Sequence, residues 1–187
     1  MSKKVCVLVA NGSEEMETVI CVDVLRRAGL DVFLAKVGEG SGAVTASRGV
    51  NLIPDGRWDP GQAGELDALV IPGGMEGTET MQGDESVLQA VRDLAAAGKL
   101  VASICAGPLV LQDAGVLAGR KYTCYPSLKD QLTAGTWVDE RVVQDGRVVT
   151  SQGPGTTFLF ALKVAENLAG AETAADVAAD LLLTYPN

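Results

Sequence analysis

Short apolar runs rich in β-branched residues alternate along the chain with longer segments whose apolar residues recur at helical spacing. The first run, residues 4–10, ends in an Asn-Gly pair typical of a turn, and the segment after it closes with two arginines and a glycine. Such alternation is satisfied by parallel strands whose crossover helices cover both faces of one sheet. The pattern predicts an α/β fold, a three-layer α/β/α sandwich with a mostly parallel sheet.

The same pattern gives the individual elements. We expect strands at residues 4–10, 31–37, 67–74, 100–104 and 121–125, and helices at residues 14–30, 85–99, 106–116, 126–132, 155–170 and 172–183. An Asp-Gly pair predicts a hairpin over residues 141–151, and the turn-rich residues 38–66 are expected to hold short β segments and one loop helix. Since no repeat or linker interrupts the pattern, we expect a single domain over residues 1–187.

Charge and composition exclude several classes of partner. The 187 residues carry a net charge of -9, which disfavours nucleic acid or an anionic membrane as the main partner. The apolar run near the start is too short for a signal peptide or a membrane span. The chain has four cysteines without a CxxC pair and no histidine, so we expect no metal site, reduced thiols and a cytoplasmic location.

Polar and small residues follow three of the expected strands, where open α/β sheets bind their ligands. Cys105 follows residues 100–104, the pair Gly73-Gly74 closes residues 67–74, and Glu14, Glu15 and Glu17 follow the first strand. A sharp strand-to-helix turn would expose the Cys105 sulfur, and a helix N-terminus would lower the pKa of the thiol. The alternative is a buried, structural cysteine, which is the default role of Cys6, Cys21 and Cys124.

The glycines and glutamates allow two interpretations each. Backbone N–H groups of Gly74 and Ala106 could form an oxyanion hole, or Gly73-Gly74 could be only a turn. Acidic residues are favoured in the first turn of any helix, with Ser13 as a candidate N-cap. Glu17 differs because it begins the apolar face of its helix. A buried Glu17 would have a raised pKa and, once protonated, could donate a hydrogen bond to a thiolate.

Four segments together resemble the ThiJ/PfpI superfamily, and most closely its DJ-one branch, which includes the parkinsonism-associated deglycase and its bacterial relatives. They contain the motifs "EEMET", "PGG", "ICAGP" and "SQGPGT", in register over essentially the whole chain. The resemblance implies a flavodoxin-like fold and a homodimer.

The resemblance also implies roles for single residues. Cys105 would be the oxidation-sensitive nucleophile, with Glu17 as the protonated carboxyl beside it and Gly74 and Ala106 as oxyanion donors. Arg48 and, from the partner subunit, Arg27 would lie near the cysteine, where an anion can bind. Gly153 and Pro154 would help to form the wall of the pocket.

Two hypotheses for the function follow from this resemblance. The first is a cofactor-free glyoxalase or deglycase, in which the Cys105 thiolate attacks methylglyoxal or its early adducts on proteins and nucleotides. The second is a non-enzymatic oxidative-stress sensor or redox-regulated chaperone that uses oxidation of Cys105. A peptidase, which some superfamily members are, would lack its histidine base here.

The sequence departs from the family pattern at two positions. Many relatives have a histidine where this chain has Tyr125, so a Cys-His mechanism is out of reach. Tyr125 is either an auxiliary hydrogen-bond donor near the sulfur or an aromatic residue packed at the rim. A second family cysteine is replaced by Ile53, so any oxidative regulation is expected to rest on Cys105.

Overall fold

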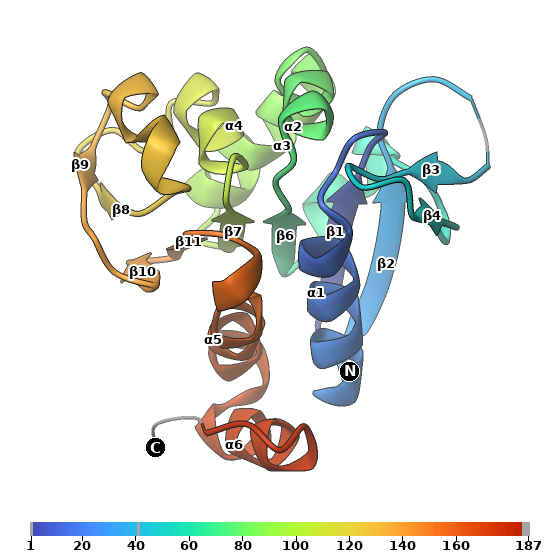
Figure 1. The fold of residues 1–187 in the computed structure, drawn as a ribbon, viewed down its shortest axis with the longest axis vertical. Coiled ribbons are helices and arrows are strands. Elements are labelled where there is room, and N and C mark those ends of the chain that lie inside the picture. Colours follow the sequence, from blue (N-terminus) through green and yellow to red (C-terminus); the bar gives the residue numbers. More distant parts are fainter. Residues whose placement is uncertain (1, 41, 185–187) are drawn as a thin grey trace.

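The computed structural model describes residues 2–40 and 42–184, and its centre is a seven-stranded sheet in the order β10-β11-β7-β6-β1-β2-β5 (Figure 1). Neighbouring strands are parallel except for the pair β10 and β11. The strands of this sheet are β1 (Lys4–Val9), β2 (Asp31–Lys36), β5 (Gly56–Arg57), β6 (Ala68–Ile71), β7 (Leu100–Ile104), β10 (Val142–Asp145) and β11 (Val148–Ser151). Two small sheets pair β3 (Val44–Thr45) with β4 (Asn51–Leu52) and β8 (Lys121–Tyr122) with β9 (Thr136–Trp137).

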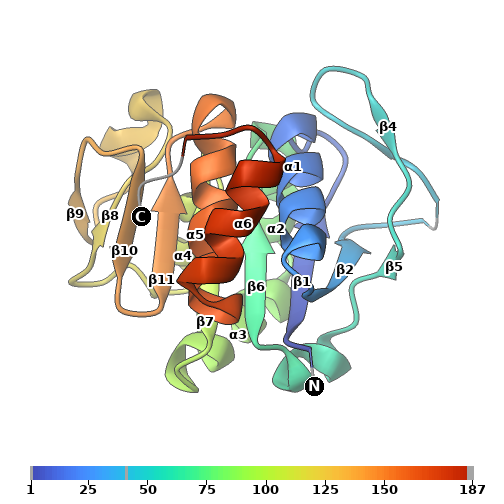
Figure 2. The same ribbon diagram turned by 90° about the horizontal axis from the view of Figure 1, so that it is seen from below.

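Helices cover both faces of the large sheet, as Figure 2 shows. One face carries α1 (Glu15–Arg27) and α5 (Thr157–Ala169), with α6 (Ala171–Asp180) packed on α5. The other face carries α2 (Met75–Gln82), α3 (Glu85–Ala96) and α4 (Pro108–Asp113). Three 3-10 helices lie in the connections, η1 (Pro60–Glu65), η2 (Pro126–Gln131) and η3 (Pro154–Thr156). Within residues 2–40 and 42–184, no helix has the length and apolarity needed to cross a bilayer.

The central strands are apolar throughout because both of their faces are covered. Every residue of β6 and β7 is buried, as is all of β1 after Lys4. The helices are amphipathic instead: α3 buries apolar residues at three- and four-residue spacing and turns its charged residues to solvent. Hydrophobic cores therefore form on both faces of the sheet.

The predicted fold class is confirmed, while several elements differ. The strand expected at residues 121–125 is reduced to Lys121–Tyr122 and lies in a separate small sheet. The helix expected at residues 106–116 begins only at Pro108, and residues 126–131 form a 3-10 helix. Helix α2 was not predicted. The single-domain prediction also covers residues 1, 41 and 185–187, which lie outside the described residues.

The order of the strands creates a crevice at one edge of the sheet. From β1 the chain moves to β2 on one side, and it later returns to β6 on the other side of β1. Helix α1 follows β1 on one face, whereas α2 and α3 follow β6 on the opposite face. The loops at the carboxyl ends of β1 and β6 therefore diverge, which is where doubly wound sheets bind ligands.

Candidate active site

Cys105 stands directly after β7 in a strained backbone conformation. Its φ of 63° is in the left-handed region that residues with a side chain rarely adopt. Two hydrogen bonds hold this conformation: Cys105 N–H donates to Ser151 O at 3.0 Å, and Tyr125 N–H donates to Cys105 O at 3.0 Å. The side chain is half-buried. Strain fixed by surrounding contacts is typical of a functional position.

Two glycines allow the loop after β6 to approach the cysteine. A Cβ atom at Gly73 would lie 2.6 Å from the Cβ of Cys105 and 2.9 Å from Glu17 Oε2. Gly74 has a φ of 87°, and a Cβ atom there would lie 2.2 Å from the carbonyl oxygen of Gly12. Gly73-Gly74 is therefore more than a turn, because it lets three loops converge on the sulfur.

Glu17 projects from α1 into the protein interior and is fully buried. Its Oε2 atom accepts a hydrogen bond of 2.7 Å from the backbone N–H of Gly73. Burial raises the pKa of Glu17 to about 7, the N–H of Gly73 works against this rise, and the charge of Glu14 adds to it. The neighbouring Cys105 thiol also works against the rise in the pKa of Glu17. Among the described residues, Oε1 has no hydrogen-bond partner. The structure thus supports the predicted inward orientation of Glu17.

The expected fall in the pKa of Cys105 was wrong. Burial raises the pKa of this thiol to about 12, and the negative charge of Glu17 contributes in the same direction. Hydrogen bonds from the backbone N–H groups of Gly74 and Ala106 to the sulfur lower it only in part. Helix α4 does not begin until Pro108 and has six residues, so its N-terminus does not outweigh burial.

Cys105 and Glu17 are neighbouring acids, and the protonation state of each affects the pKa of the other. Because the pKa of Cys105 lies above that of Glu17, Glu17 ionises first and the remaining proton lies on the sulfur. The N–H groups of Gly74 and Ala106 reduce the cost of moving this proton to Glu17 and leaving a negative charge on the sulfur. Glu17 can therefore take the thiol proton when the sulfur attacks an electrophile.

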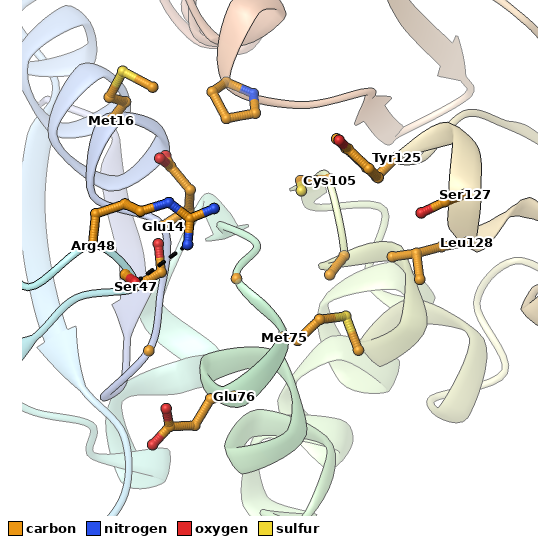
Figure 3. A pocket seen from close by; sticks show the side chains of 14 residues that line it. Glu14, Met16, Ser47, Arg48, Met75, Glu76, Cys105, Tyr125, Ser127 and Leu128 are labelled. Carbon is orange, nitrogen blue, oxygen red and sulfur yellow. Dashed lines mark hydrogen bonds between the residues drawn. The ribbon is translucent and has the colours of Figure 1, made fainter.

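A cavity of about 620 Å³ opens above the sulfur (Figure 3). The residues that line it come from the segments that follow β1, β3, β6, β7, β8 and β11, including the first turns of α1 and α2: Gly12, Glu14, Met16, Ser47, Arg48, Gly74, Met75, Glu76, Cys105, Ala106, Tyr125, Ser127, Leu128 and Pro154. The predicted residues Arg48, Tyr125 and Pro154 are among them. Gly153 adjoins the wall, where a Cβ atom would lie 3.2 Å from the Tyr125 ring.

Arg27 lies outside this cavity. It forms an ion pair of 2.5 Å with Asp23 on the outer surface of α1 and lines a separate groove there. Its predicted role was assigned to a partner subunit, which a single chain does not test, so that role remains a prediction.

Glu15 was considered only as an acidic residue of the first helical turn, but it positions the loop that carries Arg48. Its carboxylate accepts hydrogen bonds from the Ser47 hydroxyl at 2.8 Å and from Arg48 N–H at 2.9 Å. Burial alone would raise the pKa of Glu15, but these bonds, with those from its own N–H and that of Val50, outweigh burial and lower it. No sequence signal pairs residue 15 with residue 48, because the contact depends on how two loops fold together.

Two further expectations are corrected at the start of α1 and α2. Glu14, rather than Ser13, caps α1, since Glu14 Oε2 accepts a hydrogen bond of 2.7 Å from Glu17 N–H. The Ser13 hydroxyl instead accepts a hydrogen bond of 3.0 Å from Ala10 N–H. Met75 and Glu76 line the cavity because α2 begins at its edge, and neither these residues nor that helix was predicted from the sequence.

We expect Cys105 to be the first cysteine that peroxide or an alkylating reagent modifies. The thiols of Cys6, Cys21 and Cys124 are buried, and burial raises the pKa of each. Cys105 has a similarly raised pKa, so its preference rests on access through the cavity and on the adjacent proton acceptor. Peptide mass mapping after substoichiometric peroxide measures the order, and modification mainly at a buried cysteine would reject it.

The chain is similar to known proteins over most of its length. The sequence profile of the DJ-1/PfpI family matches residues 3–167. Protein dj-1beta of Drosophila melanogaster is 44% identical over 187 residues, covering 99% of this chain and 100% of that protein. The crystal structure of Drosophila melanogaster DJ-1beta matches with a TM-score of 0.93 and 45% sequence identity. The match covers 99% of this chain and 100% of that chain.

Two more distant relatives have names that bear on chemistry. Oxidized DJ-1 of Toxoplasma gondii is 41% identical, with a TM-score of 0.92 and coverage of 98% of this chain and 100% of that chain. The glutathione-independent glyoxalase DJR-1.2 of Caenorhabditis elegans is 37% identical over 162 residues, covering 86% of this chain and 85% of that protein.

Proposed function

The chain belongs to the DJ-1/PfpI family, and from this premise we propose that it is a Cys105-dependent, cofactor-free glyoxalase or deglycase acting on methylglyoxal or its early adducts. One observation carries the proposal: at the floor of an open cavity, Cys105 lies beside the Glu17 carboxyl and the backbone N–H groups of Gly74 and Ala106. This arrangement contains a nucleophile, a proton acceptor and oxyanion donors. A relative named as a glutathione-independent glyoxalase supports the choice of substrate.

The first step of the proposed reaction joins the sulfur to the aldehyde carbon. As the S–C bond forms, the thiol proton moves to Glu17, and the electron pair of the carbonyl bond moves onto its oxygen. The N–H groups of Gly74 and Ala106 would stabilise this oxyanion, which then takes the proton from Glu17 to give a hemithioacetal.

The second step moves hydrogen between the two carbons of the bound substrate. Glu17 removes the proton from the former aldehyde carbon and returns a proton to the neighbouring carbon, giving a thioester of the 2-hydroxyacid. Water then hydrolyses the thioester, which releases lactate and the Cys105 thiol. The carbon redox change is internal, so the reaction needs no external oxidant.

Steady-state kinetics with methylglyoxal on metal-stripped protein test this proposal directly. We expect stoichiometric lactate formation without added glutathione. If no lactate forms with fully reduced Cys105, the enzymatic proposal is wrong.

The second candidate function is a redox sensor or redox-regulated chaperone based on Cys105 oxidation. It is favoured by the half-buried sulfur beside a carboxyl that can hydrogen-bond to an oxidised product. A cytoplasmic location, which belongs to both proposals, would keep the four free thiols reduced until oxidant appears. Peroxide-dependent holdase activity without aldehyde turnover would select this candidate.

We expect Tyr125→Phe to lower aldehyde turnover by about tenfold at most, since a single auxiliary hydrogen bond contributes roughly 1 kcal/mol. The Tyr125 side chain is 46% exposed and lies across the cavity from Arg48, with Cys105 between them (Figure 3). Steady-state rates of both proteins would measure the effect. Were Tyr125→Phe as damaging as loss of Cys105 while Glu17→Gln stayed near wild type, the tyrosine would be the acid–base group.

We also propose a homodimer that uses the outer surface of α1. Met16, Val19 and Ile53 are exposed apolar residues, and Ile53 is 83% exposed. The groove next to Ile53 is lined by residues from α1, β2 and β4, and it includes Arg27. Sedimentation at micromolar concentration is expected to show about twice the 19.3 kDa mass of the chain. A species of one chain only would contradict the proposal.

A further inference from the structure

A second cavity, of about 210 Å³, lies away from Cys105 on the face of the sheet that carries α3. Cys6 of β1 and Ala35 of β2, both buried, form its floor, and Leu66 lines it from the connection between η1 and β6. It shares no lining residue with the cavity above Cys105 or with the groove beside α1. Neither the proposed catalysis nor the proposed dimer therefore uses it.

Two aromatic side chains, Phe33 and Trp58, line this cavity. Phe33 is 43% exposed although it lies in a strand of the central sheet. Its ring packs against the backbone of Gly56, where a Cβ atom would lie 2.7 Å from the ring. The Trp58 indole N–H donates a hydrogen bond of 2.9 Å to the Ser86 hydroxyl, which fixes the orientation of that ring. Both rings are held in place, so a ligand that stacks on them costs little additional ordering.

The charged side chains that reach the cavity are two cations and two carboxylates. Lys4 forms an ion pair of 2.6 Å with Glu65. Arg57 donates to two backbone carbonyl oxygens, and Asp59 accepts a hydrogen bond from a backbone N–H at the start of η1. Because these charges balance and three of the four have partners within the protein, the lining favours a ligand without charge.

Asp31 is the fourth of these side chains, and it is placed to accept a hydrogen bond from a ligand. Within residues 2–40 and 42–184 it forms no ion pair, since Lys4, its neighbour across the pair of β1 and β2, is held by Glu65. Asp31 precedes Phe33 by two residues in β2, so both side chains lie on one face, about 7 Å apart along the strand. A fused two-ring ligand that stacks on Phe33 can therefore direct an N–H group toward Asp31.

We propose that this cavity binds an uncharged, fused-ring aromatic molecule that carries an N–H donor and has the size of indole. An apolar cavity of about 150 Å³ can hold benzene, so a volume of about 210 Å³ leaves room for a second ring. The rings of the ligand lie against Phe33 and Trp58 and over the sulfur of Cys6, which is a favourable neighbour for an aromatic ring. The site is independent of the chemistry at Cys105 and does not rest on the proposed function.

The chain has two tryptophans, and this makes the site observable. In two-dimensional nitrogen–proton spectra each indole N–H gives one signal, and Trp137→Phe identifies the signal of Trp58. We expect added indole to shift the Trp58 signal saturably and to leave the Trp137 signal in place, with a Kd on the order of 0.1 to 1 mM for a ligand of this size. A Trp58 signal that indole does not shift would overturn the proposal.

Variants of Phe33 test the contribution of the aromatic wall. Phe33→Ala should weaken indole binding about tenfold or more, and Phe33→Leu, which keeps apolar bulk without a ring, about two- to tenfold. Phe158→Ala is the matched control, because Phe158 is 37% exposed and lies outside the cavity, so this variant should bind indole like wild type. The spectra without ligand show that each variant is folded. Wild-type affinity in both Phe33 variants would contradict the proposal.

N-methylindole tests the requirement for an N–H donor. It should bind about two- to tenfold more weakly than indole, because it cannot donate a hydrogen bond to Asp31. In Asp31→Ala the affinity for indole should fall to that for N-methylindole, so that the difference between the two ligands disappears. Equal affinities of the two ligands for wild type, or a difference that persists in Asp31→Ala, would show that the assignment of Asp31 and of an N–H ligand is wrong.

Discussion

We expect Cys105→Ser to abolish aldehyde turnover. The serine hydroxyl is not ionised near pH 7, and the chain has no histidine to activate it. The Glu17 carboxylate is too weak a base for an alcohol, although it can accept a proton from a thiol whose negative charge two N–H groups stabilise. Lactate formation at substrate saturation measures the loss.

The control for this prediction is to show that the Cys105→Ser protein is folded like wild type. Serine is close to cysteine in size, and the left-handed backbone at residue 105 is held by bonds from Tyr125 and to Ser151 that do not involve the side chain. Circular dichroism should therefore match that of wild type. A folded Cys105→Ser protein that keeps more than a few per cent of the wild-type rate would remove the sulfur from the mechanism.

Glu17→Gln is expected to lose on the order of 10²-fold or more in kcat/KM, the typical effect of removing a general acid–base group. The amide can occupy the same space and can still accept the hydrogen bond from Gly73 N–H, but it cannot take up and return a proton. In wild type, kcat/KM should rise with pH through about 7, because the deprotonated carboxylate is needed to accept the thiol proton. This limb of the pH profile should be missing in the variant.

Stability gives an independent readout of the same residue. The folded-state pKa of Glu17 lies above the unfolded value, so the stability gained from the protonated carboxyl is complete below pH about 4.5 and is lost as pH rises through about 7. The Glu17→Gln variant carries no ionisable group at this position, so its stability does not fall as the pH rises through this range. Relative to wild type, the variant should gain about 3 kcal/mol in free energy of unfolding between pH 4 and pH 8.

Matched variants make the two readouts of Glu17 decisive. Glu79→Gln removes one carboxylate from an exposed helix surface and should change neither the pH profile nor the pH dependence of unfolding. If Glu17→Gln retains near-normal turnover together with the expected gain in stability, Glu17 is a buried acid without a catalytic role.

The convergence of Glu17, Gly73-Gly74 and Cys105 could be predicted because each follows a strand of a parallel sheet. Carboxyl ends of parallel strands share one edge, so residues far apart in sequence meet there. Helix α2 could not be predicted so easily, since it is short and contains Gly77. The structure explains this glycine: a Cβ atom at position 77 would lie 2.5 Å from the Ser13 hydroxyl oxygen.

The protonation of the site was beyond the sequence. A helix after Cys105 predicts a lower pKa, but the outcome depends on how deeply the surrounding loops bury the sulfur, and burial raises the pKa instead. The hydrogen bonds by which Glu15 positions the Arg48 loop likewise depend on tertiary contacts. Local patterns report which groups are available, whereas their charge state is set by packing.

The pairing of a buried carboxyl with a thiol in a chain that has no histidine makes the site unusually easy to observe. Burial raises the pKa of the Glu17 carboxyl to about 7, and the chain has no histidine whose imidazole would titrate beside it. The infrared carbonyl band of a protonated carboxyl, followed near neutral pH, would therefore report this one residue. Proton release during alkylation of Cys105 could be measured without a contribution from histidine side chains. The protonation of Glu17 and Cys105 can therefore be followed through the reaction without isotope labels.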